Sequence, residues 1–428
     1  MIRPNLISLW MLALAVSVCS GVADAQNYIP DSGPYQHQPL IQMPQSVYQP
    51  PIVDHYVQRA PRLWDDEQPV EWFLGELAKR SWLRVEYLHW ETDNSGLDTA
   101  GAPVTGATNL YQATNVFPGE SVSTQNSALL DLSSVSLSDA SGARGTWGLA
   151  LNGGQMELSV FGTQEVTDTV SQTLPFLRVD DAIAGAQTIQ IGNIGVPLLT
   201  NGVVGTAGVA NHLVFDQSVS ASVSSQIWGS ELALLTNAYL PGEGFHLQWL
   251  GGFRYVNLDE GYSIRGVDRT STNAVPTRTT TIHSATINNV YGPQVGARAS
   301  LVHRWFSLSA TPRITFGLND YQAQVDYDTR VSDGSSPTVT TQSKLDEIEF
   351  NTITQVNFLG EIHLSAAFSV YGGYDFMWMP QVARARDTVR FNSVTPLNAV
   401  ASEPSVTVLE DLSSVIVQGL SVGATFRY

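Results

Sequence analysis

The feature that most constrains this chain is an alternation of apolar and polar side chains with a period of two, which recurs from residue 81 to the C-terminus. Within residues 245–257, Phe245, Leu247 and Trp249 share one phase, whereas His246 and Gln248 occupy the other. A period of two predicts a strand with one apolar and one polar face. Ten segments show this pattern, each about as long as a tilted strand that crosses hydrocarbon. They are residues 82–92, 142–152, 155–164, 225–237, 245–257, 291–301, 308–316, 347–364, 367–379 and 412–428.

The connections between these segments alternate in length along the chain. The long ones are residues 93–141, 165–224, 258–283, 321–346 and 380–411, and the short ones are 153–154, 238–244, 303–305 and 365–366. A β-sandwich has no reason to gather its long loops at one end, whereas outer-membrane barrels have short periplasmic turns and long external loops. We therefore predict an all-β fold, a transmembrane antiparallel up-and-down β-barrel of about ten strands with both termini in the periplasm. Twelve strands would result if residues 127–137 formed part of another hairpin.

The composition agrees with a protein whose surface lies partly in lipid. Only 14% of the residues are charged, against about 25% in ordinary soluble proteins. The net charge of −18, with two lysines, argues against a nucleic-acid partner. The five long connections together carry −12 of this charge, which predicts an acidic external side. The sole cysteine, Cys19, excludes a disulfide framework and a thiolate metal site.

The N-terminus reads as an export signal. Residues 1–25 contain Arg3, an apolar run over residues 6–18 and the sequence Ala23-Asp24-Ala25, which together are typical of a cleaved secretory signal peptide. A membrane anchor is the alternative, although the run is short for a bilayer. A lipoprotein cleaved at Cys19 is disfavoured because Val18 is bulky.

Residues 26–80 form a Pro-, Gln- and Tyr-rich segment that we interpret as a periplasmic linker before a barrel at residues 81–428. The linker is either a plain tether or a segment that reaches the cell wall or the barrel. Residues 71–80 could form one or two helical turns.

Tryptophans are concentrated in or beside the predicted strands, mostly near their ends, as interfacial girdles require. The alternative interpretation is a sandwich core. The predicted aromatic girdle consists of Trp82, Trp90, Trp147, Trp228, Trp249, Trp305 and Trp378.

The last segment carries the most specific pattern. Leu420, Val422 and Phe426 share one phase, and the chain ends on an aromatic residue. With Ser421, Gly423, Phe426 and Tyr428 at matching intervals, it resembles the C-terminal signal of proteins inserted by the barrel-assembly machinery. That resemblance implies transient contact with this machinery and a final location in outer-membrane lipid.

Several segments are similar to the putative beta-barrel porin family numbered seven, a group of bacterial outer-membrane proteins. These are residues 82–90, 148–151 with Glu157, 228–231, 250–260 and 291–296, within a similarity that spans about residues 81–428. The resemblance implies an outer-membrane barrel and transfers no functional residues. Pro293 departs from the pattern, where a second glycine is expected, and predicts a bulge or a local edge.

The polar phase should place charged side chains inside the barrel. They are Arg84, Glu86, Glu157, Glu231, Arg254, Arg298, Arg313, Glu361 and Asp375. A ten-stranded barrel is narrow, and isolated charges away from water are costly, so we expect these groups to pair across the lumen. We hypothesise a narrow or occluded pore in which Arg254, Arg298 and Arg313 form a basic wall with Glu231 and Glu361 as partners. A purely stabilising role is equally compatible with the sequence, as is passage of small solutes or ions.

No catalytic chemistry is evident. The chain lacks the common hydrolase, zinc-protease and phosphate-loop motifs, and its histidines do not have metal-ligand spacing. We therefore expect no enzyme activity, cofactor, metal or catalytic residue. Two alternatives remain open. One is adhesion through the acidic loops 93–141 and 165–224; the other is a surface hydrolase using Asp259, Glu260 and His283. The sequence leaves the oligomeric state open.

Overall fold

A computed structural model describes residues 75–94, 99–102, 110–115, 124–173, 193–200, 209–238, 244–269, 277–332, 334, 338–393 and 404–427. The predicted signal peptide and most of the predicted linker lie outside this part of the chain. Residues 75–79 form one helical turn directly before the first strand. Within the described ranges, no helix is long and apolar enough to cross a membrane.

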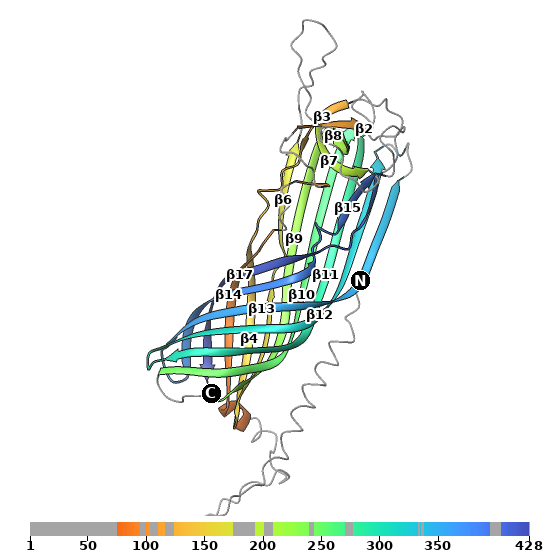
Figure 1. Ribbon diagram of the computed structural model, residues 1–428. Helices are drawn as coiled ribbons and strands as arrows, with labels where there is room; N and C mark the ends of the chain where they lie inside the picture. The colour runs from red at the N-terminus through yellow and green to blue at the C-terminus, as the bar shows by residue number, and fades with distance from the viewer. Residues whose placement is uncertain are drawn as a thin grey trace, which may run out of the picture. The chain divides into compact units, whose positions relative to one another are not determined.

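Strands make up nearly all of the described chain (Figure 1). They are β1 Ser81–Thr92, β2 Leu110–Asn115, β3 Thr124–Leu129, β4 Leu137–Leu151, β5 Gly154–Thr163, β6 Val166–Thr173, β7 Asn193–Thr200, β8 Val209–Phe215, β9 Ser218–Thr236, β10 Gly244–Arg269, β11 Thr277–Val302, β12 Phe306–Val331, β13 Val339–His363, β14 Phe368–Ala383, β15 Val389–Ser393, β16 Pro404–Val408 and β17 Leu412–Arg427.

Ten of these strands close into an antiparallel barrel. The ring runs β1-β4-β5-β9-β10-β11-β12-β13-β14-β17 and returns to β1. At the closing seam, Trp82 pairs with Arg427 and Thr92 with Val417, so the first and last strands meet along most of their length. The predicted fold class and the number of ten strands are confirmed. Residues 127–137 add no barrel hairpin, because β3 belongs to a separate sheet and β4 begins at Leu137.

The strands extend much further than the sequence pattern indicated. β10, β11 and β12 have 26 residues each, more than twice the number needed to cross hydrocarbon. The predicted long connections 258–283 and 321–346 are therefore wrong for most of their length, because both are largely strand. Along β9, pairing passes from β5 to β6 with a shift of one residue, which continues the wall beyond the bulge at residues 164–165.

The reason for this error is an inversion of polarity part-way along the strands. On the outer face of β12, Phe316 and Leu318 are 46% and 45% exposed, whereas the following outward residues are Asp320, Gln322 and Gln324. On the inner face the change is opposite: polar Thr315 and Asn319 give way to apolar residues from Tyr321 onward. An apolar exterior suits hydrocarbon and a polar exterior suits water, so the membrane-embedded section ends near Leu318.

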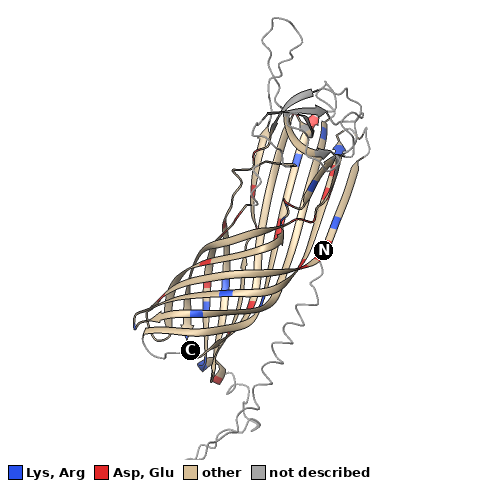
Figure 2. Cartoon of the chain, viewed as in Figure 1, with Lys and Arg blue, Asp and Glu red and all other residues tan. Residues whose placement is uncertain are grey.

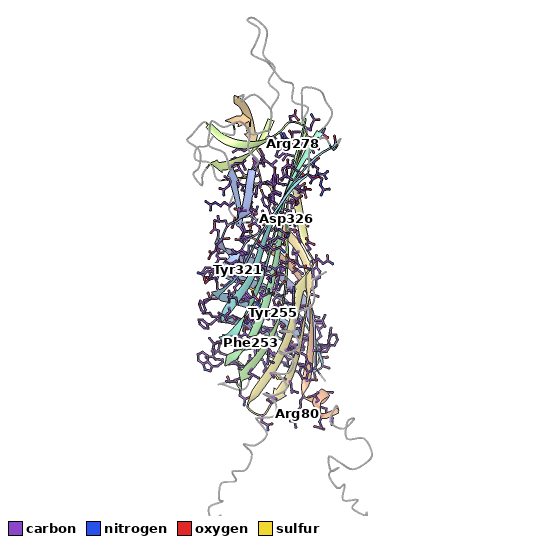
Figure 3. The ribbon with its side chains drawn as sticks, turned by 90° about the vertical axis from the view of Figure 1, so that its right-hand side faces the viewer. Arg80, Phe253, Tyr255, Arg278, Tyr321 and Asp326 are labelled. Carbon is purple, nitrogen blue, oxygen red and sulfur yellow. The ribbon has the colours of Figure 1, made fainter. Side chains whose placement is uncertain are left out.

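Neighbouring strands change polarity at the same level. On β10, the outward residues are apolar up to Phe253 and Tyr255 and become polar at Asn257 and Asp259. Figure 3 shows Phe253 and Tyr255 at the level of the tilted barrel wall, with Tyr321, Asp326 and Arg278 successively nearer the opposite end from Arg80. The strands beyond this level therefore stand outside the membrane.

We call this outer section, together with the second sheet, the head. The second sheet has the order β16-β15-β7-β3-β2-β8, with an additional pairing between β7 and β8. Buried apolar side chains from this sheet, from the adjoining connections and from the inner faces of β9 to β12 form one core. Its members include Leu132, Val196, Phe215, Tyr262 and Val325. The head is thus a folded β-structure with its own core, built on extended barrel strands.

Pro293 does not produce the expected bulge. The pairing of β11 with β12 lapses at Gly292 and Pro293 and resumes at Gln294 in the same register. A second lapse occurs opposite Pro312, again without a shift. Proline lacks the N–H that the ladder needs, so each proline leaves a local gap between two strands that are otherwise in register.

Candidate functional site: the barrel interior

All nine charged residues predicted to face the lumen line one cavity of about 340 Å³ in the membrane-embedded section. Arg144 and Arg427 line it as well. Period two explains the gathering, because each of these residues occupies the inward phase of its strand. Figure 2 shows basic and acidic residues set into strands of the barrel wall.

A three-membered ionic cluster joins β1, β4 and β14. Arg144 on β4 donates from Nε to Glu86 at 2.6 Å and from Nη2 to Asp375 at 2.9 Å. The two carboxylate side chains are almost fully buried. Because one guanidinium binds two carboxylates on different strands, the cluster fixes the relative position of three barrel strands.

Three further ion pairs cross the interior between strands that are not neighbours in sequence. Arg298 on β11 donates two hydrogen bonds to Glu157 on β5, at 2.7 and 2.8 Å. Arg427 donates to Glu361 at 2.7 Å. Arg313 pairs with Glu231. Such guanidinium–carboxylate contacts satisfy charges that would otherwise be costly inside the barrel.

Two arginines in the cavity have no carboxylate contact in the described chain. Arg254 is only 1% exposed; it donates to the side-chain oxygen of Gln355 and to the Met377 sulfur, and its guanidinium stands 5.7 Å from the Phe161 ring centre. Its Nε has no hydrogen-bond partner.

The second is Arg84, whose Nε donates to the Thr425 hydroxyl at 3.2 Å. Its guanidinium lies about equally far from the rings of Trp82 and Tyr371, at 5.1 and 5.0 Å. Both arginines are therefore held by neutral groups.

The cavity reaches the end of the barrel that carries the short turns. Its lining includes Gln155, His246, Val302 and Ser307, all within three residues of a strand end there. These side chains are only partly buried, whereas Arg254 and Asp375 deeper inside are almost fully buried. The cavity is therefore a cup whose mouth lies at the short-turn end.

An apolar layer fills the interior above this cup. It is built from inward side chains of nine of the ten barrel strands, all except β12. We call this cluster the apolar layer; its members are Leu88, Trp90, Ala140, Phe161, Ile227, Val256, Leu258, Val290, Ile353, Met377, Met379, Val382, Val415 and Val417. These side chains are all almost fully buried, so the layer offers a column of water no polar surface.

Polar contacts close the interior again at the top of the layer. Asn288 donates to the Ala383 carbonyl at 2.8 Å and accepts from the Ala383 N–H at 2.8 Å. Asn319 and Asn351 both donate to the Gln381 carbonyl. The upper end of β14 thus lies directly against inward asparagines of β11, β12 and β13.

The segment after β14 is tied into the same region by Arg384. Its Nε donates to Glu260 at 3.0 Å, and its Nη atoms donate to the side chain and carbonyl of Asp93. The Ala385 N–H also donates to Glu260. This network joins β10, the residue that follows β1 and the chain that leads into the head.

The predicted aromatic girdle needs a correction. Trp147, Trp228, Trp249, Trp305 and Trp378 belong to the outward phase or to an exposed turn. Trp90, by contrast, is 2% exposed inside the apolar layer, and Trp82 lies in the inward phase beside Arg84. Both share the parity of Arg84 and Glu86, a signal that the prediction from strand ends overlooked.

The predicted assembly signal spans both faces of β17. Ser421 is buried inside the barrel, and Gly423 shares its inward phase. Phe426 lies on the outer face and is 43% exposed; its ring centre is 5.2 Å from that of Phe368. Tyr428 lies outside the described residues.

The residues considered for a hydrolase are not brought together. Asp259 and His283 lie on the outer face of the head, whereas Glu260 points inward and binds Arg384. The loops 93–141 and 165–224, which were considered for adhesion, are described only in part, and there they contribute strands of the head.

Sequence reasoning missed Arg144 and Arg427, which complete the ionic contacts. Arg144 shares the phase of Thr146, and Arg427 that of Thr425, so strand parity alone would have identified both. It could not have identified their partners, because these depend on which strands face each other across the ring.

A closed ring of antiparallel strands with an apolar belt and a charged interior defines an outer-membrane β-barrel protein. The model of the family described as putative beta barrel porin-7 matches residues 82–428, and the chain belongs to that family. No curated protein matches the chain.

Solved structures with some likeness are membrane proteins of low identity. The outer-membrane protease OmpT from Escherichia coli is 8% identical with a TM-score of 0.38, covering 82% of this chain and 97% of that chain. A FadL homologue from Pseudomonas aeruginosa is 10% identical with a TM-score of 0.21, covering 81% and 90%. The toluene transporter TodX of P. putida is 6% identical with a TM-score of 0.17, covering 83% and 92%. Likeness at this level carries no argument about activity.

Proposed function

We propose that this protein is an occluded outer-membrane barrel that anchors an external β-head, rather than an open diffusion pore. The observation that supports this most directly is the apolar layer, to which nine strands contribute side chains. Ions would have to shed water to enter such a layer, which costs far more than passage through a hydrated channel. The ionic contacts below it hold the wall strands together.

Single-channel recording in planar bilayers tests this proposal. The purified full chain should insert without steady conductance. Trp90→Ser combined with Met377→Ser places polar groups in the layer and should raise ion flux, whereas Trp228→Ser, on the outer face, should not. A large steady conductance of the unaltered protein would refute the proposal and favour passage of small solutes.

A second candidate function is surface interaction through the head. The head has a core of its own, and the outward phase of β12 carries Asp320, Asp326 and Asp328. Deleting whole loops would also remove core residues such as Leu130 and Leu132, so a charge change is the cleaner test. Asp326→Asn with Asp328→Asn should weaken calcium-dependent aggregation of cells that display the protein. Unchanged aggregation would argue against this role.

A further inference from the structure

We propose that the cup in the membrane-embedded section binds a small oxyanion, a carboxylate or phosphate, that enters from the periplasmic end. This goes beyond the anchoring role, because an occluded barrel needs no ligand. Six guanidinium groups line the cup against five carboxylates, so these groups together carry one net positive charge.

The positive charge that no carboxylate contacts lies on two arginines of the cup. Four arginines contact all five carboxylates, and the two that remain are Arg84 and Arg254. Arg254 is 1% exposed, and its Nε donates to nothing in the described chain. A buried cation without a direct carboxylate contact is costly, and a bound anion would reduce that cost.

The surroundings of both arginines favour an anion over water alone. Aromatic rings flank each guanidinium: Phe161 at Arg254, and Trp82 with Tyr371 at Arg84. Such flanking holds each planar guanidinium in place. At Arg254 the Nε–H has no acceptor in the described chain, and at Arg84 the Nε–H alone is engaged, by Thr425, so N–H groups of both can donate to an oxyanion. The nearby carboxylates are already engaged by other arginines, which limits their repulsion of the ligand.

Size and access narrow the class of ligand. A cavity of about 340 Å³ lies at the lower end of the range for small-molecule sites, so the solute is small. The apolar layer blocks entry from the head. The side chains at the short-turn end are partly exposed, so the ligand enters there.

Isothermal titration calorimetry on the detergent-solubilised full chain tests the proposal. Inorganic phosphate and acetate are the two anionic probes, and choline is the cationic control. At least one anion should bind saturably, and choline should not. The anion that binds more tightly identifies the preferred oxyanion, carboxylate or phosphate. Arg254→Gln and Arg84→Gln should each weaken binding by about tenfold or more. The matched control is Arg265→Gln, an exposed residue on the outer face of the same strand, β10.

Folding is checked by heat-modifiable migration of every variant. If Arg254→Gln fails to fold, Arg84→Gln alone carries the test. Absence of saturable binding to both anions, equal binding of choline, or undiminished binding by the folded variants would each overturn the proposal. None of these outcomes bears on whether the barrel conducts, so failure here is distinguishable from failure of the anchoring role.

Discussion

At the scale of single residues, the inward charges are organised as pairs rather than as a continuous basic wall. Arg313 pairs with Glu231 as the sequence suggested, whereas Arg298 pairs with Glu157 and Arg254 with no carboxylate in the described chain. Parity along a strand predicted which residues face inward. The partners depended on the strand order and stagger of the closed ring, which the spacing of residues along the chain does not determine.

Breaking a buried pair should cost much more than breaking an exposed one. Glu157→Gln leaves Arg298 without its carboxylate and should lower the free energy of unfolding by about 3–5 kcal/mol. Glu76→Gln, in the exposed pair with Lys79, is the control and should have little effect. Denaturant unfolding in micelles measures both. Equal effects of the two substitutions would contradict the assigned role of the interior pairs.

Asp259, on the outer face of the head, gives a pH-dependent prediction. Partial burial, with the nearby Glu165 carboxylate, raises the pKa of Asp259. The carboxyl group of Asp259 therefore binds its proton more tightly in the folded state than in the unfolded chain. Its contribution to the free energy of unfolding is present at acid pH and is lost as the pH rises through the folded-state pKa. Asp259→Asn should raise the melting temperature at pH 7 but not at about pH 3. A gain of the same size at both pH values would contradict this assignment.

At the scale of elements, the sequence predicted where strands lie but not where they end. The segment 308–316 was recognised because it is apolar outside, while its continuation to Val331 in β12 went unrecognised because its apolar residues face inward. The alternation itself never stops. A pattern of outward-facing apolar residues therefore identifies only the part of each long strand that lies in the membrane.

The closing seam between β1 and β17 depends on close backbone approach at Gly423. A Cβ at this position would stand 2.1 Å from the Val85 carbonyl oxygen, so a side chain would push the first and last strands apart. Gly423→Ala should reduce the fraction that refolds into detergent in the absence of any assembly machinery. Ala424→Val, on the outer face of the same strand, should refold normally. Normal refolding of Gly423→Ala would instead favour a role confined to recognition by the machinery.

At the scale of the whole molecule, one set of strands passes through two environments. Lipid surrounds the section below Leu318 and water the section above it, and the interior is charged in the first and mostly apolar in the second. Composition and connection lengths were enough to predict a barrel. The head could not be predicted, because its core brings together segments far apart in sequence, such as Leu132, Phe215 and Val406.

We propose that the barrel interior is open toward the periplasm and closed toward the cell exterior. Labelling from one side tests it in a Cys19→Ser background, which removes the only native cysteine. Ser309→Cys places a thiol in the cup, and Ser263→Cys places one on the outer face of the head. In intact cells, a membrane-impermeant maleimide should label Ser263→Cys but not Ser309→Cys, and both should react once the outer membrane is permeabilised. Labelling of Ser309→Cys in intact cells would contradict the account.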